Sequence, residues 1–180
     1  MPFESMETTM EELAVQDLPT SPHCFVCGEH NPAGLHARFH VENGMVKMPL
    51  TAGDRHCGYP DVVHGGVLAA ALDECMGWAA ARSIHRMCVT GELTVRYLKP
   101  VAPGPGFTVY AEVVRSSRRL VHTKGWIAGP DGERHAQAEG RFLPLSEQET
   151  LRIDDGMVYR GGEERVFDVL RPVGDVQEGT

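Results

Sequence analysis

The feature that most constrains the fold of this chain is one long apolar segment, GGVLAAALDECMGWAAARS, which runs from Gly65 to Ser83. Its content of Ala and Leu favours a helix over a strand, and a helix that is apolar on nearly every side must be buried. Asp73 and Glu74 interrupt it in the middle, so it falls short of the about 18 uninterrupted apolar residues of a membrane span. We therefore predict a buried helix at the centre of a domain.

Strand-like runs lie on both sides of this helix. Before it, residues Leu35–Val41 alternate apolar and polar side chains, and Asn43-Gly44, the typical dipeptide of a two-residue β-hairpin, leads into a second alternating run over 46–50. Residues 51–64 resemble a loop. Four more runs follow the helix, and because their connections are short we expect them to form an antiparallel meander. These runs are Val89–Leu98, Phe107–Val114, Leu120–Ala128 and Arg134–Leu143.

Together these elements predict an α+β fold in which one antiparallel β-sheet wraps around one long central helix. The 180 residues are enough for one substantial core. Both ends of the chain are acid-rich and have no sustained period. We therefore expect a domain over 21–145, an N-terminal arm over 1–20 and a C-terminal tail over 146–180.

Charge and composition exclude several classes of protein. Lys and Arg total 17 against 25 Asp and Glu, a net charge of -8, whereas a nucleic-acid-binding protein needs a basic surface. The acidic N-terminus has neither the basic start nor the apolar stretch of a signal peptide. We therefore expect a cytoplasmic protein with no membrane or nucleic-acid partner, whose five cysteines are free thiols.

The start of the predicted helix has the first chemical signal. His64 precedes Gly65-Gly66, and two glycines leave the first helical amides sterically open. Those amides have no partner within the helix, and the positive end of the helix dipole favours an anion or a polarised carbonyl oxygen. The structural alternative is that the glycines only permit a tight turn.

The two carboxyl groups in the middle of the helix are the second signal. Helix geometry places Asp73 and Glu74 about 100° apart around the axis, so they cannot share one face. A carboxylate in an apolar core must be paired, hydrogen-bonded, at an opening or functional. The structural alternative to a function is a salt bridge with Arg82 or Arg96.

The segment from His64 to Asp73 resembles the HGG-x6-D signature of hotdog-fold acyl-CoA thioesterases. It is most similar to the PaaI-like branch of the 4-hydroxybenzoyl-CoA thioesterase superfamily. The LDE-x-MGWA continuation and the LTVRYLKPV strand extend the similarity, which covers residues 24–145. The resemblance implies that a thioester is hydrolysed to a carboxylic acid and CoA-SH. It also implies that no cofactor is needed, since coenzyme A is part of the substrate.

The resemblance also implies a role for each residue of the signature. The Gly65 amide would hold the thioester oxygen with Gly66 beside it, and His64 would orient this region. Asp73 would act as nucleophile or as general base toward water, and Thr90 would position that water.

Two positions qualify this assignment. Glu74 stands next to Asp73 and is the alternative carboxylate at the substrate. Many relatives place an Asn six residues before the histidine, where this chain has Gly58. This departure bears on the identity of the substrate more than on the type of reaction.

Basic residues crowd one predicted hairpin of this acidic chain. Arg115, Arg118, Arg119 and Lys124 could bind the phosphate groups of CoA. A solvated hairpin surface is the alternative.

The cysteines offer half of a zinc-binding pattern. Cys24 and Cys27 form a C-x-x-C pair, and His23, His30, His56 or Cys57 could complete a site, but the sequence has no second C-x-x-C. The resemblance makes this pair a family marker, so we expect no metal.

Assembly follows from the helix spacing. Gly65 and Asp73 are eight residues apart, which separates their backbones by about 12 Å along the axis. One thioester must lie within hydrogen-bonding reach of the amide and ~3–3.5 Å from the attacking atom. One chain cannot provide both groups, so we expect a homodimer with shared active sites, whose dimers could pair into tetramers.

Two other functions are compatible with the same fold. The chain could be a non-catalytic protein that binds acyl-CoA or acyl carrier protein, or it could be a hotdog dehydratase or hydratase.

Overall fold

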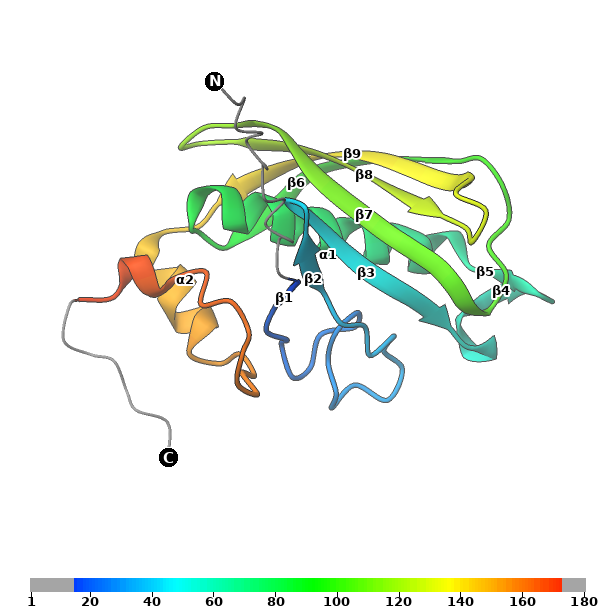
Figure 1. Cartoon of the computed structure of the whole chain (residues 1–180), viewed down its shortest axis with the longest axis horizontal. Helices are drawn as coiled ribbons and strands as arrows, with labels where there is room; N and C mark the ends of the chain where they lie inside the picture. Colours follow the sequence, from blue (N-terminus) through cyan, green and yellow to red (C-terminus); the bar gives the residue numbers. More distant parts are fainter. Residues whose placement is uncertain (1–14, 173–180) are drawn as a thin grey trace, which may run out of the picture.

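Helix α1 (Gly65–Ile84) lies against one long antiparallel sheet in the computed structural model, which describes residues 15–172 (Figure 1). The sheet has seven strands in the order β1-β2-β3-β7-β8-β9-β6. This architecture confirms the predicted α+β fold. The strands of the sheet are β1 (Gln16–Asp17), β2 (His40–Glu42), β3 (Met45–Ala52), β6 (Cys88–Tyr97), β7 (Gly104–Ser116), β8 (Val121–Ala128) and β9 (Arg134–Pro144).

The remaining elements are short. The loop before α1 contains the 3-10 helix η1 (Asp54–His56) and a small hairpin of β4 (Cys57–Tyr59) and β5 (Val62–Val63). Helix α2 (Glu147–Asp154) and the 3-10 helix η2 (Asp168–Leu170) follow the sheet. None of the described helices combines the length and the apolar character needed to cross a membrane.

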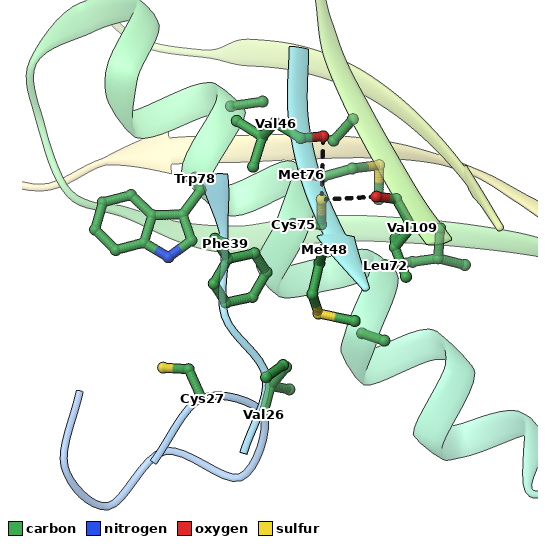
Figure 2. Packing of buried hydrophobic residues seen from close by; sticks show 14 of the residues in the cluster. Val26, Cys27, Phe39, Val46, Met48, Leu72, Cys75, Met76, Trp78 and Val109 are labelled. Atoms are coloured by element: carbon green, nitrogen blue, oxygen red, sulfur yellow. Dashed lines mark hydrogen bonds between the residues drawn. The ribbon is translucent and has the colours of Figure 1, made fainter. Parts of the chain in front are cut away.

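Burial of α1 against the sheet builds the core. Leu72, Cys75 and Met76 have no exposed surface, and the Cys75 Sγ lies 3.5 Å from the carbonyl oxygen of Val46 and 3.9 Å from that of Val109 (Figure 2). The helix thus contacts β3 and β7 directly with its central side chains. This confirms the prediction of a buried central helix, which ends one residue later than expected.

The predicted hairpin turn is confirmed. Asn43 and Gly44 have φ values of 52° and 76° and connect β2 to β3, with Val41 opposite Val46. Two consecutive positive φ values are typical of the type I′ turn, whose twist matches that of the strands.

The strand predicted over Leu35–Val41 is wrong for most of its length, because β2 begins only at His40. Leu35 and Ala37 are buried as the alternation requires, at 8% and 7% exposure. Their amides, however, donate to the carbonyl oxygens of Phe25 and Val26 in a loop. Alternation of apolar and polar residues indicates that one side of an extended segment is buried. It does not distinguish a neighbouring strand from a loop as the partner of that segment.

The meander predicted for the last four strands is correct only for β7, β8 and β9. Strand β6 pairs with β9 at the far edge of the sheet and does not neighbour β7. Residues 98–103 make this connection. Six extended residues reach about 20 Å, which exceeds the about 14 Å of three interstrand spacings, so this short connection can cross the end of the sheet.

Both predicted end segments contribute to the packed structure where it is described. Residues 15–20 provide β1 and Leu18, which is 2% exposed. In the C-terminal segment, Phe167 is fully buried, and its ring centroid lies 6.4 Å from that of Trp78 on α1. An acid-rich composition does not reveal this packing, because a few large apolar side chains are enough to hold a segment against the core. Residues 1–14 and 173–180 of the arm and tail lie outside the described residues.

The docking of the C-terminal segment generates a stability prediction. We expect Phe167→Ala to lower the free energy of unfolding by about 3–5 kcal/mol, because it leaves a cavity beside Trp78. Val169→Ala, at a side chain that is 66% exposed in the same segment, should cost less than about 0.5 kcal/mol. Urea unfolding at one protein concentration measures both. Equal, small losses would show that this segment adds nothing to the core.

Candidate functional site

The N-terminus of α1 has one open amide. The Gly66 N–H donates to Nδ1 of His64 at 2.8 Å, and the His64 carbonyl oxygen accepts from the N–H groups of Val67 and Leu68 at 2.9 and 3.3 Å. This leaves Gly65 as the one residue of the first turn whose N–H has no acceptor within residues 15–172. An open amide at the positive end of a helix is suited to a carbonyl oxygen that gains negative charge.

Glycine at both positions permits close approach at this site. A Cβ on Gly66 would lie 3.0 Å from Nδ1 of His64, so a larger residue would push the capping ring away. The Tyr97 hydroxyl donates to the Gly65 carbonyl oxygen at 2.8 Å, and a Cβ on Gly65 would meet that ring at 3.3 Å. Because Nδ1 of His64 accepts a hydrogen bond, a neutral His64 has its proton on Nε2.

Asp73 lies further along α1, half-buried, and faces strand β6. The Thr90 hydroxyl donates to Asp73 Oδ1 at 2.8 Å. Burial raises the pKa of the Asp73 carboxyl, and the hydrogen bond from Thr90 opposes part of that shift. The structure thus brings together the two residues, an acid and a hydroxyl, that the resemblance assigns to the attack on the thioester.

Glu74 meets a different part of the chain, the loop that contains Cys24. The Cys24 thiol donates to its Oε2 at 2.7 Å, and burial raises the pKa of Glu74 to about 8. The two adjacent carboxyl groups therefore diverge, as the 100° turn between neighbouring helical residues requires.

The salt-bridge alternative for these carboxyl groups is wrong. Arg82 pairs with Glu164, with its Nε 2.6 Å from the carboxylate. Among residues 15–172, neither Asp73 nor Glu74 has a Lys, Arg or His partner at ion-pair distance. Both carboxyl groups thus stay without a cation.

Strand β6 links the two halves of the candidate site and is an edge of the sheet. Tyr97 contacts Gly65 near one end of this strand, whereas Thr90 contacts Asp73 near the other. Val89 on this strand and Leu98, the residue that follows its last position, are 48% and 46% exposed. The site therefore lies along an open strand edge that presents apolar side chains to solvent.

The predicted basic cluster is divided. Arg118 and Arg119 are exposed in the turn between β7 and β8, at the end of the sheet nearer to Thr90 than to Gly65. Lys124, on β8, forms an ion pair with Glu112, with its Nζ 2.9 Å from the carboxylate. The structure leaves the two arginines available for an anion and places Lys124 in a surface ion pair.

A pocket of about 310 Å³ opens beside the N-terminus of α1. His64 and Val67 form its helical side, and Phe25 of the N-terminal loop and Cys57 of β4 also line it. A larger hollow of about 530 Å³ over residues 51–56 includes neither Gly65 nor Asp73. The sequence did not predict the loop residues of the first pocket, since they have no pattern beyond scattered apolar positions.

Comparison with known proteins identifies relatives of this arrangement. Residues 61–127 match the family model of the thioesterase superfamily. Two proteins of Saccharolobus solfataricus, provisionally named as esterases, are 32% and 33% identical over 83 and 85 residues. The matches cover 45% and 47% of this chain, and 54% and 60% of those proteins. The chain therefore spans little more than half the length of these relatives.

Solved structures share the architecture. One, described as a thioesterase superfamily protein, is 29% identical with a TM-score of 0.62, covering 68% of this chain and 63% of that chain. A Bacillus halodurans protein crystallised with CoA is 28% identical with a TM-score of 0.50, covering 56% and 66%. The E. coli PaaI protein of the phenylacetic acid degradation operon, 18% identical with a TM-score of 0.56 over 62% and 81%, shows the fold alone. These matches confirm the predicted resemblance.

The cap at the start of α1 generates a second prediction. We expect His64→Ala to lower the free energy of unfolding by about 1 kcal/mol, because the Gly66 amide loses its acceptor. His64→Asn supplies another acceptor and should stay near the wild-type value. Urea unfolding compares the two variants. Equal losses in both would contradict the capping role.

Proposed function

We propose that this chain, which matches the thioesterase superfamily model over residues 61–127 and shares the fold of a thioesterase superfamily structure, hydrolyses an acyl-CoA thioester to a carboxylic acid and CoA-SH. The proposal rests on the open Gly65 amide, which occurs on the same helix as Asp73, a half-buried carboxyl group that has no cationic partner among residues 15–172. The provisional esterase names of the two Saccharolobus relatives agree with hydrolysis.

The geometry suits stabilisation of a developing oxyanion. The thioester oxygen would accept the Gly65 N–H, and the negative charge that grows on it during attack would be stabilised by that amide and the helix dipole. Removal of one such donor in other enzymes costs about 2.7–4 kcal/mol of transition-state stabilisation. His64 and Gly66 fix the direction of this amide through the cap.

Asp73 would provide the attack. As general base it takes a proton from water while the water oxygen bonds to the acyl carbon, and the carbon–sulfur bond then breaks to release the CoA thiolate, which takes up that proton. As nucleophile its carboxylate would bond to the acyl carbon while the carbon–sulfur bond breaks and the CoA thiolate leaves. Water would then hydrolyse the resulting anhydride, which restores the Asp73 carboxylate and releases the carboxylic acid, and the thiolate takes up the proton that is set free. In both routes the Thr90 hydroxyl orients the carboxylate. This chemistry draws only on the chain's own groups and on the substrate.

Substrate contacts outside the thioester would come from two regions. Arg118 and Arg119, which have no ion-pair partner among residues 15–172, lie near the Thr90 end of β6, where they could bind CoA phosphates. The pocket beside His64 could receive an apolar part of the substrate. The Bacillus halodurans relative, crystallised with CoA, supports a CoA ester over other thioesters.

The site would be completed by a second copy of the chain. Gly65 and Asp73 lie about 12 Å apart along α1, too far for one thioester. The open edge of β6, with its exposed apolar side chains, offers a surface on which a second copy could pair antiparallel. An antiparallel partner helix would bring its Asp73 near this chain's Gly65. We therefore propose a homodimer with two shared sites.

A panel of acyl-CoA esters tests the function. The purified chain is mixed with aliphatic and aromatic acyl-CoAs, and release of free thiol is followed with a thiol-reactive dye. Turnover of at least one ester supports the proposal. Tight binding of acyl-CoA without thiol release would instead favour a non-catalytic binding protein, and hydration of an enoyl-CoA would favour a hydratase.

The role of Asp73 yields a third prediction. We expect Asp73→Asn to lower kcat by several orders of magnitude with little change in folding, because the change removes the charge and keeps the volume. Glu42→Gln is the matched control, since this carboxylate on β2 pairs with Lys47 and lies on the other side of the sheet from β6. Steady-state kinetics and circular dichroism measure both. Wild-type kcat in Asp73→Asn would refute the role.

Subunit mixing yields a fourth prediction. Asp73→Asn and Gly65→Val are each expected to be inactive alone. In a mixed dimer one site has both lesions and the other has none, so random reassortment should restore about a quarter of wild-type activity. Thiol release is measured before and after subunit exchange, which native mass spectrometry of mass-labelled chains verifies. Zero activity after verified exchange would contradict shared sites.

A further inference from the structure

The C-x-x-C pair and Glu74 form a cluster that the proposed hydrolysis does not use. The Sγ atoms of Cys24 and Cys27 and a carboxylate oxygen of Glu74 all lie within 4.8 Å of one another. The two cysteines belong to a loop at the edge of the core, where Figure 2 shows Cys27 on the same loop as Val26, and Glu74 comes from α1. The sequence separates them by about 50 positions, so spacing alone did not indicate Glu74 as a third donor.

The loop is built as a turn around the two sulfur atoms. The amides of Val26 and Cys27 donate to Cys24 Sγ at 3.2 and 3.5 Å, and the amide of Ser21 donates to Cys27 Sγ at 3.4 Å. Backbone N–H groups can donate to a thiolate sulfur, which is the form of cysteine that binds metal. The same donors would hold the sulfurs in place as an outer shell.

Gly28 makes this turn possible. A Cβ at this position would lie 2.4 Å from the carbonyl oxygen of Cys24, 2.5 Å from its amide nitrogen and 2.7 Å from the carbonyl oxygen of Pro22. The Gly28 amide also donates to the Cys24 carbonyl oxygen at 3.0 Å. The chain thus closes tightly behind the two cysteines and directs both side chains to one point.

The charge of the cluster calls for a cation. Deprotonated, two thiolates and a carboxylate place three negative charges within a partly buried space. No Lys, Arg or His of the described residues lies at ion-pair distance from Glu74. Arg38 comes near but donates to the carbonyl oxygens of Cys27 and Ala37 and pairs with Glu29. No cation of the described residues therefore balances these charges once the three groups are deprotonated.

We propose that Cys24, Cys27 and Glu74 bind one zinc ion, which ties the loop over 21–28 to α1. Two sulfur donors and one carboxylate oxygen suit zinc better than magnesium or calcium, which take oxygen ligands. Three protein donors leave one position of a tetrahedral site for water. The three proposed ligands are different residues from the Asp73–Thr90 pair, and Glu74 leaves α1 about 100° around the axis from Asp73.

Metal binding is tested on the full chain. The protein is stripped with a chelator, checked for folding by circular dichroism and titrated with zinc. Bound zinc is then measured by mass spectrometry of the metal. We expect one equivalent per chain. Titration with cobalt in place of zinc should give thiolate-to-cobalt charge-transfer absorption, which reports on sulfur ligands directly.

Variants locate the site. Cys24→Ser and Cys27→Ser should weaken zinc binding by about 100-fold, and Glu74→Gln by about 10-fold or more. Cys57→Ser removes a free thiol outside the cluster and should bind like wild type. Asp73→Asn should also bind like wild type, so failure of the hydrolase proposal would leave this one standing.

Three results would overturn the proposal. The first is a folded wild-type chain that binds no zinc more tightly than the Cys24→Ser/Cys27→Ser double variant does. The second is cobalt binding without thiolate absorption, which needs no variant and applies even if the variants fail to fold. The third is a Cys24–Cys27 disulfide, seen as a loss of two hydrogens in intact mass, that forms in preference to the zinc complex.

Discussion

Burial of α1 is the constraint on which the rest of this structure depends. A helix that packs Leu72, Cys75 and Met76 against the sheet with no exposed surface leaves few places for polar chemistry. Those places are its open first turn and its two adjacent carboxyl groups. Because the surroundings are apolar, each polar group there must be satisfied by a defined partner, and the partners determine its chemistry.

The two carboxyl groups illustrate how one helix serves two purposes. The 100° step between neighbouring residues directs Asp73 to the Thr90 hydroxyl on β6 and Glu74 to the thiol of Cys24 on the N-terminal loop. The first environment is an open strand edge that substrate and a second subunit could reach. The second environment is a tight loop that holds two cysteine sulfur atoms next to the carboxylate, which suits a metal ion. Adjacent residues thus belong to different sites because the sheet and the loop cover different sides of α1.

Sequence reasoning succeeded where local geometry decides the outcome. The Asn43-Gly44 turn was predictable because only residues that tolerate positive φ make a tight hairpin with the right twist. It failed where partners are distant. The alternation over Leu35–Val41 revealed burial but not the partner, which is a loop. The position of β6 beside β9 depended on whether residues 98–103 cross the end of the sheet, which no local pattern reports.

By itself, the sequence determined the central helix, its glycine start and the divergence of Asp73 from Glu74, because helix periodicity and the cost of burying charge act within one segment. Only the tertiary structure decided which partner each group meets. It left the Gly65 amide open, brought Thr90 to Asp73, and brought Cys24 and Cys27 to Glu74. These contacts join residues far apart in the chain, and their formation depends on how the sheet and the loops close around α1, which is a property of the whole packed core.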